Sequence, residues 1–244
     1  MIASRVFKTG WKMTALVGAG LMLSGQSAPE QNAANLAKVE RTDTSHIIGD
    51  PNAPVTFTEW VSYTCPACGS FARSGEEVIK IAYVDPGKVK VEVRYLQRNV
   101  VDVAVTLAAW CGGPEKFPLN HSTIMYRQAD WLPKVQNATK AQQNRWFTGT
   151  ESQRRKAIAS DIDLYSVMET RGIGRIELDR CLSDEELGRR LEAASTADTG
   201  KYDLHGTPSF AINGGMLEDA HSWPQIAPLL SQATMPKAAS YGPN

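Results

Sequence analysis

The sequence has no excess of charge of either sign. Its 244 residues include 26 lysines and arginines and 26 aspartates and glutamates, so the formal net charge is zero when histidine is neutral. A domain that binds nucleic acid usually carries a strongly basic surface, and we therefore expect no nucleic-acid partner. The chain also shows no internal repeat and no long low-complexity run, which argues against a repeat architecture.

Residues that bind metals are scarce. The chain has four histidines and four cysteines, and neither a His-x-His pair nor a second Cys-x-x-Cys accompanies the motif at Cys65 and Cys68. A zinc ribbon needs a second pair of ligands at close spacing, whereas Cys111 and Cys181 stand alone. The favoured interpretation of the motif is redox chemistry, with half a zinc site or a purely structural bridge as alternatives.

The placement of Cys65-Pro-Ala-Cys68 fits redox chemistry. The motif follows an apolar, strand-like run, Val55–Val61, and precedes a segment that can form a helix. Cys65 is therefore expected at a helix N-terminus, where the positive end of the helix dipole stabilises a thiolate. The thiolate is the form that reacts in thiol–disulfide exchange.

The N-terminus has the features of an export signal. Arg5, Lys8 and Lys12 form a basic start, and residues 13–23 form an apolar run that is too short to span a bilayer but suits a signal peptide. We predict a signal peptide over 1–27, and the alternative is an uncleaved N-terminal anchor. In both cases the rest of the chain faces an oxidising compartment, where disulfides persist, and we expect it to be periplasmic.

Two further segments outside the folded part are predicted from composition. A polar linker is expected over 28–44 and a flexible tail, rich in Pro, Ala and Gly, over 235–244. Removing these segments and the signal leaves roughly 200 residues, which is enough for one domain with an elaborated core.

The first part of the fold reads as a βαβ unit. Residues 45–48 are predicted as a short edge strand and Val55–Val61 as a buried strand. A helix follows the cysteines and ends at the Asp-Pro-Gly turn 85–87. Residues 88–95 then alternate charged and apolar side chains, which indicates a second strand, parallel to the first.

A long helical segment separates this unit from the last strands. Helices are predicted over 101–111, 115–127, 151–160, 166–170, 176–182 and 184–199. Strand structure returns with the apolar run before Asn213, and the Asn-Gly-Gly turn predicts a hairpin. A last amphipathic helix is expected over 222–232.

Two motifs together resemble a known family. Ser-Tyr-Thr-Cys-Pro-x-Cys occupies residues 62–68, and Gly-Thr-Pro-x-Phe-x-x-Asn-Gly occupies 206–214. With the order of elements, they resemble the DsbA-like disulfide oxidoreductases of the bacterial envelope. The resemblance implies an α/β, thioredoxin-like fold with a large α-helical insertion. The thioredoxin-like part would comprise 45–99 and 200–234, and the insertion 100–199.

The resemblance also implies roles for individual residues. Cys65 matches the family's nucleophile, and Cys68 matches the buried cysteine that resolves the mixed disulfide. Pro208 matches a cis-proline, which would let the backbone of Thr207 pair with a substrate strand; a trans loop proline is the alternative. Glu59 matches a buried acid that relays the proton of Cys68, and the alternative is an ordinary solvent-facing strand residue.

Other residues are weaker candidates. His205 lies three residues before the proline and could border the active site, although a lone histidine in a loop is more often a surface residue. Cys111 and Cys181 are expected to form a structural disulfide, because an exported chain with two remaining cysteines favours their pairing. Two separate buried thiols are the alternative.

The predicted function follows from the resemblance. It implies a periplasmic thiol–disulfide oxidoreductase that introduces disulfides into exported proteins with reduced cysteines. A membrane redox partner would reoxidise it, and no cofactor and no metal would be needed. The alternatives are an envelope disulfide isomerase or reductase and a non-catalytic chaperone or binding module. A monomer is expected, because residues 29–45 look too short and too polar for the dimerisation segment of dedicated isomerases.

Overall fold

The computed structural model describes residues 38–236. The predicted signal peptide, most of the predicted linker and all but two residues of the predicted tail lie outside the described residues. None of the helices within 38–236 is both long enough and apolar enough to cross a membrane.

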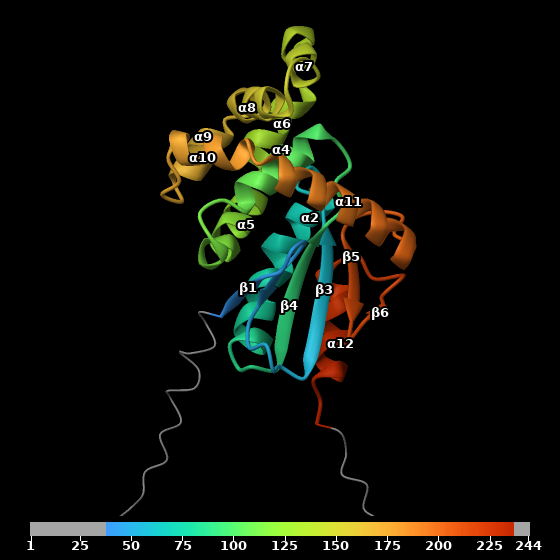
Figure 1. Cartoon of the computed structure of the whole chain (residues 1–244). Helices are drawn as coiled ribbons and strands as arrows, with labels where there is room; N and C mark the ends of the chain where they lie inside the picture. The colour runs from blue at the N-terminus through green and yellow to red at the C-terminus, as the bar shows by residue number, and fades with distance from the viewer. Residues whose placement is uncertain (1–37, 237–244) are drawn as a thin grey trace, which may run out of the picture.

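A six-stranded mixed sheet forms the base of the structure (Figure 1). Its spatial order is β1-β2-β4-β3-β5-β6. The bounds are β1 (Val39–Arg41), β2 (His46–Ile48), β3 (Val55–Val61), β4 (Val89–Tyr95), β5 (Ser209–Ile212) and β6 (Gly215–Met216). The edge strand β1 was not expected, because it falls in the segment predicted as polar linker; its short Val-Glu-Arg sequence carries no strand pattern.

The predicted βαβ unit is confirmed. Strands β3 and β4 pair in parallel over their full lengths, from Val55 opposite Val89 to Val61 opposite Tyr95. The connection is helical but not uniformly α-helical. It consists of α2 (Pro66–Phe71), the π-helical η1 (Ala72–Glu76), α3 (Glu77–Ile79) and the π-helical η2 (Lys80–Val84).

The central strands are buried on both faces. Phe57, Glu59 and Val61 alternate with Thr58 and Trp60, and all five are almost inaccessible to solvent. On the first face, Phe57 stacks on Phe210 with ring centroids 5.4 Å apart. On the second, the indole N–H of Trp60 donates to Asp198 of α11 at 2.8 Å. Both faces of the sheet are therefore covered.

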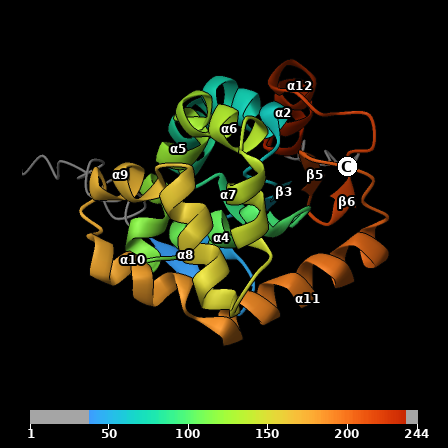
Figure 2. The same ribbon diagram turned by 90° about the horizontal axis from the view of Figure 1, so that it is seen from above.

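The segment between β4 and β5 is almost entirely helical, and its helices gather at one end of the sheet (Figures 1 and 2). The bounds are α4 (Val100–Ala109), η3 (Pro114–Lys116), α5 (Phe117–Tyr126), α6 (Gln128–Gln136), α7 (Lys140–Trp146), α8 (Glu151–Asp161), α9 (Leu164–Glu169), α10 (Arg175–Leu182) and α11 (Glu185–Tyr202). After the hairpin, α12 (Trp223–Ala233) ends the described fold.

Two of these helices were not predicted. Helix α6 contains Pro133 in its interior, a residue that normally argues against a helix. Helix α7 is mostly polar and lacks an apolar repeat. Its start is fixed by a capping box, in which Thr139 accepts from the backbone of Gln142 while the Gln142 side chain bonds back to Thr139.

A disulfide ties the helical segment together. Cys111, which follows α4, is bonded to Cys181 in α10, and their Cα atoms lie 5.6 Å apart. The two residues are 70 positions apart in the sequence. The bond therefore links the start of the helical segment to its later part.

Candidate active site

The local sequence places Cys65 at the N-terminus of α2. Pro66 occupies the first turn of the helix, a position that needs no backbone donor. Cys65 is the residue before the helix, with extended backbone angles. Its own N–H donates to the carbonyl of Ser62 at 3.1 Å, which closes the turn between β3 and the helix.

The environment of Cys65 favours its thiolate. The pKa of the thiol is lowered from 9.0 to about 5, first because the Cys68 thiol can donate to the sulfur. Burial opposes this, while the Thr207 side chain and the backbone N–H groups of Cys68 and Ala67 lower the pKa further. These donors stabilise the anionic sulfur more than its burial penalises it.

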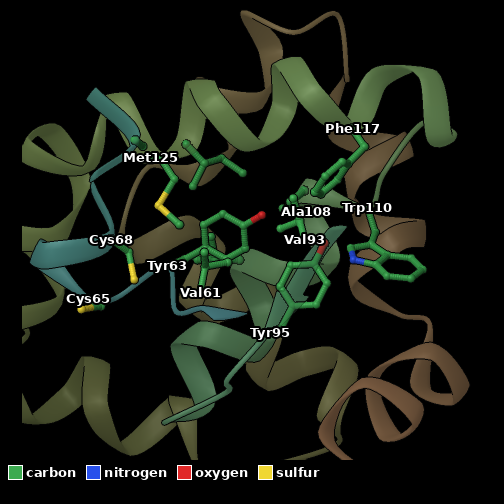
Figure 3. Close-up of a cluster of buried hydrophobic side chains, with 14 of the residues drawn as sticks. Val61, Tyr63, Cys65, Cys68, Val93, Tyr95, Ala108, Trp110, Phe117 and Met125 are labelled. Atoms are coloured by element: carbon green, nitrogen blue, oxygen red, sulfur yellow. The ribbon is translucent and has the colours of Figure 1, made fainter. Parts of the chain in front are cut away.

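Cys68 has the opposite character. It is buried, and burial, followed by the interaction with Cys65, raises the pKa of its thiol well above 9.0. The two cysteines are free thiols in this structure. Figure 3 shows them at the edge of a buried cluster, with Tyr63 beside them and its hydroxyl directed away from both sulfurs. Near neutral pH the pair therefore combines a Cys65 thiolate with a Cys68 thiol.

The second motif lies directly against the first. The peptide bond between Thr207 and Pro208 is cis. In the protonated state the Cys65 thiol donates to the Thr207 carbonyl, with the sulfur 3.1 Å from the oxygen. Residues 142 positions apart in the sequence thus meet at one sulfur atom.

His205 does not contact the cysteine pair. Its side chain is 85% exposed and lies 3.3 Å from Asp203. It borders the surface hollow beside Thr207, together with Gly206 and Arg98. This placement fits the surface interpretation of the residue.

An aspartate of the helical segment holds the loop before Cys65. Asp102 is buried in α4, and its carboxylate accepts from the Thr64 N–H at 2.9 Å and from the Ser62 hydroxyl at 2.9 and 3.0 Å. The Thr64 hydroxyl and the Arg98 N–H donate to the same carboxylate, each at 3.0 Å. Sequence reasoning missed this residue, which lies in a run of apolar side chains.

A glutamine supports the same loop from another side. The side-chain amide of Gln128, the first residue of α6, donates to the carbonyls of Tyr63 at 2.7 Å and Cys65 at 2.8 Å. A Cβ at Gly69 would lie 2.3 Å from the Gln128 side-chain oxygen, so the glycine allows this close approach. No sequence signal singled out Gln128, because α6 itself was not predicted.

Glu59 is buried rather than solvent-facing. It is 2% exposed, and it lies on the same face of β3 as Phe57 and Val61. Its pKa is raised from 4.5 to about 8, mainly by burial and then by Glu76, while His121 opposes the shift. Glu59 is therefore largely protonated at neutral pH, and it can donate a proton as well as accept one.

Two further side chains surround Glu59. His121 of α5 places its Nε2 atom 3.9 Å from a Glu59 oxygen and 3.2 Å from a Glu76 oxygen. Burial lowers the pKa of His121, but the two glutamates outweigh it and the net shift is upward. No pattern in the sequence singled out Glu76 or His121, because helical periodicity does not show which polar residue faces a buried acid.

The chain is similar to known thioredoxin-like proteins in both sequence and structure. The family model described as thioredoxin matches residues 41–232. A protein-disulfide isomerase from Novosphingobium aromaticivorans, known from a crystal structure, is 41% identical, and the match covers 79% of this chain and 99% of that chain with a TM-score of 0.75. Alpha-DsbA1 from Wolbachia pipientis is 16% identical, with 84% and 96% coverage and a TM-score of 0.62, which shows a common fold alone.

The curated relatives are longer than this chain. A Rickettsia bellii protein, whose name as a protein-disulfide oxidoreductase is provisional, is 25% identical over 183 residues, which are 75% of this chain and 61% of the relative. The match thus covers less than two thirds of that relative. The predicted α/β fold with a helical insertion is confirmed. The chain belongs to the thioredoxin family, in the DsbA-like form of the fold.

Proposed function

We propose that this protein is a thiol–disulfide oxidoreductase that introduces disulfides into exported proteins through the Cys65–Cys68 pair. The observation that carries the proposal is the opposed character of the two thiols beside the Thr207 carbonyl. One cysteine is a stable thiolate and the other a buried thiol, which is the asymmetry that directed exchange requires. A non-catalytic binding module would not need it.

The reaction begins with the pair oxidised. A substrate thiolate attacks the Cys65 sulfur, a mixed disulfide forms and the Cys68 sulfur leaves. Because the pKa of Cys68 is high, its sulfur leaves poorly as an anion and needs a proton. We assign that proton to Glu59, which is buried and protonated near neutral pH. Replacement of Glu59 by glutamine is expected to slow this step, measured by rapid-mixing fluorescence; an unchanged rate would remove Glu59 from the mechanism.

The second step releases the product. The other thiolate of the substrate attacks the substrate sulfur of the mixed disulfide, and the Cys65 sulfur leaves as a thiolate. A thiol of low pKa is a good leaving group, so this step suits the environment of Cys65. The substrate loses two electrons and two protons, and the enzyme pair is left reduced.

Thr207 and Pro208 are proposed to align the substrate. The Thr207 carbonyl accepts from Cys65 only when the sulfur carries a proton. In the disulfide and thiolate states the carbonyl has no such donor, so it can accept from the backbone of an extended substrate beside the reacting sulfur. The role of Pro208 is to hold Thr207 in this position.

The helical segment is proposed to be an insertion, residues 100–199, into a thioredoxin-like part formed by 45–99 and 200–234. Asp102 and Gln128 lie in the proposed insertion, and both form hydrogen bonds to the loop that carries Cys65 in the thioredoxin-like part. The Cys111–Cys181 bond is proposed to be structural. It would brace the insertion at a distance from the exchange chemistry.

A periplasmic location and a membrane redox partner are also proposed. They rest on the resemblance, on the apolar N-terminal run and on a disulfide between cysteines other than the motif pair. Expression of the full chain, followed by cell fractionation and N-terminal sequencing, tests them. Recovery of the unprocessed chain in the cytoplasm would contradict the location.

A disulfide isomerase is the second candidate. It is favoured by the 41% identity to a protein described as a protein-disulfide isomerase. The low pKa of Cys65 favours the oxidase, because a stabilised thiolate stabilises the reduced enzyme and makes the disulfide more oxidising. The two candidates are therefore separated by the reduction potential of the pair.

The deciding measurement is equilibrium with glutathione buffers. We expect a potential nearer to about −120 mV than to about −270 mV. The Cys111→Ala and Cys181→Ala double variant should be measured alongside, so that the second disulfide does not contribute to the signal. A potential near that of thioredoxin, together with efficient repair of scrambled disulfides, would refute the oxidase proposal.

A further inference from the structure

A cluster of three ligating side chains lies behind the active-site loop. Glu59 of β3, Glu76 of η1 and His121 of α5 each offer one ligating atom, and these atoms lie within 4.8 Å of one another. The side chains of Glu59 and His121 are 3% and 4% exposed, and that of Glu76 is 19% exposed. The exchange mechanism uses only the first of the three.

The spacing of the ligating atoms suits a small divalent cation. Nitrogen and oxygen ligands at about 2.0–2.2 Å from a tetrahedral zinc ion are separated from one another by roughly 3.3–3.6 Å. The His121 Nε2 atom is 3.2 Å from Glu76 and 3.9 Å from Glu59. Small side-chain movements would bring all three atoms to the zinc distance, and the partly exposed Glu76 is free to make them.

An unsatisfied atom points independently to a ligand. The second carboxylate oxygen of Glu59, Oε2, is buried and has no hydrogen-bond partner. Burying a polar atom without a partner is unfavourable. Two carboxylates near one another in an apolar setting also repel when both are charged. A divalent cation bound to Glu59 would give this buried carboxylate a partner and neutralise both carboxylates.

The surroundings of His121 match those of a metal ligand. Its other ring nitrogen, Nδ1, is 2.9 Å from the hydroxyl of Tyr63. When an ion is bound, Nδ1 would donate to Tyr63 and Nε2, which lies 3.2 Å from Glu76 in this structure, would give its lone pair to the ion. Ligand histidines are usually oriented by such a bond through the second nitrogen. Tyr63 also lies two residues before Cys65, so it joins this cluster to the active-site loop.

A cavity of about 180 Å³ adjoins the cluster and would leave the fourth ligand position open to water. Its walls are mostly apolar, with Phe57, Val91 and Val93 from the sheet. Lys80 also lines it, but its ammonium group pairs with Asp85 at 3.0 Å, so it does not occupy the acidic cluster. Three protein ligands with water in the fourth position are an arrangement that zinc adopts in many proteins.

We propose that Glu59, Glu76 and His121 bind one zinc ion, with water as the fourth ligand. One nitrogen and two carboxylate oxygens suit zinc better than calcium or magnesium, which prefer six or more oxygen ligands. The bound ion would cross-link β3, η1 and α5 and fix the orientation of Tyr63. This site is distinct from the Cys65–Cys68 pair, but it shares Glu59 with the exchange mechanism. A zinc-bound Glu59 would carry no proton, so the proton transfer to Cys68 described above belongs to the zinc-free form.

The test uses the untagged protein with Cys65 and Cys68 oxidised, because reduced thiolates would themselves bind zinc. Zinc is titrated in competition with a chromophoric chelator, and thermal unfolding is measured with and without zinc. We expect one zinc per chain and a higher unfolding temperature when zinc is bound. Cobalt in place of zinc should give the visible absorption of a four-coordinate ion with oxygen and nitrogen ligands.

Glu76→Gln and His121→Gln are expected to weaken binding by at least about tenfold, because even loss of a residue that orients a ligand has such an effect. Glu77→Gln is the matched control, since Glu77 is the next residue and lines the same cavity without belonging to the cluster. It should bind zinc like the parent. Equal affinity in Glu76→Gln and Glu77→Gln, or no zinc bound by the folded, oxidised parent, would overturn the proposal.

Discussion

The side-chain amide of Gln128 donates a 2.8 Å hydrogen bond to the carbonyl oxygen of Cys65. The same amide holds the carbonyl of Tyr63 at 2.7 Å, so one side chain of the insertion satisfies two buried acceptors next to the nucleophile. Asp102 satisfies donors of the same loop from the other side. The insertion is therefore part of the structure that fixes the position of Cys65.

Replacement of Gln128 by alanine should loosen this loop. Two buried carbonyl groups lose a donor, and the expected loss of stability is about 1–3 kcal/mol in denaturant unfolding. The exchange rate should fall as well, because Cys65 is held less firmly. Gln136→Ala is the matched control, since Gln136 is an exposed residue of the same helix. If both variants unfold and react alike, Gln128 does not support the loop.

The low pKa of Cys65 should depend on Cys68. Because the Cys68 thiol makes the largest contribution to the shift, Cys68→Ala is expected to raise the pKa of Cys65 from about 5 toward its ordinary value. Cys68→Ser retains a hydroxyl donor at the same place and should keep most of the shift. The rate of alkylation of Cys65, followed against pH, measures both. An unchanged pKa in Cys68→Ala would assign the shift to the other groups around the sulfur.

The contribution of Cys65 to the stability of the reduced protein should rise with pH between about 5 and 9, whereas Glu59, whose folded pKa is raised to about 8, contributes in the opposite direction below that pH. The pKa of Cys65 is about 5 in the folded state, against an ordinary value of 9.0, so the unfolded chain binds more protons in this interval. This contribution then increases with pH and is lost again as pH falls through the folded value. Urea unfolding of the reduced protein at several pH values measures the trend.

Cys65→Ser is the control for this prediction. It removes the titrating thiol, so the stability of the reduced parent relative to that of Cys65→Ser should increase as pH rises over the same interval. The oxidised protein should also lack this contribution, since neither motif cysteine then titrates. Identical pH profiles for reduced parent and Cys65→Ser would show that other groups set the trend.

The residues that sequence analysis identified are those marked by short motifs. Cys65 and Cys68 are separated by two residues, and Thr207 precedes a proline in a loop that resembles the family's, so short motifs indicated their chemistry. Gln128, His121 and Glu76 reach the site only through tertiary packing. Their positions depend on where α5 and α6 end and how they rotate, and polar residues at helical spacing do not show which of them turns inward.

Elements of the fold with a strong sequence pattern were predicted, and elements that depend on tertiary contacts were not. The strong alternation in β4 and the apolar run of β3 predicted two parallel strands, and the structure has both. The three residues of β1 have no comparable pattern, and their strand exists because β2 offers an edge to pair with. Helix α7 likewise depends on its capping box and on the burial of Trp146 rather than on an apolar repeat.

Removal of the Cys111–Cys181 bond should lower stability without abolishing exchange. The bond closes a loop of 70 residues, for which the chain-entropy model gives about 4 kcal/mol, an upper value because strain in the folded state reduces it. Both cysteines lie in the helical segment, whereas Cys65, Cys68 and Thr207 lie outside it. The Cys111→Ala and Cys181→Ala double variant is therefore expected to unfold at lower denaturant and to exchange thiols at close to the parent rate.

Peptide mapping of the non-reduced parent provides the direct check, and one linked pair containing both cysteines is expected. The single variant Cys111→Ala separates loss of the bond from loss of packing, because it leaves Cys181 as a partly buried free thiol. If the double variant keeps its stability but loses exchange activity, the bond acts on the active site and does not serve as a brace. Helix α4 would transmit this effect. Cys111 follows its C-terminal end, and Asp102, which holds the Cys65 loop, lies near its N-terminal end.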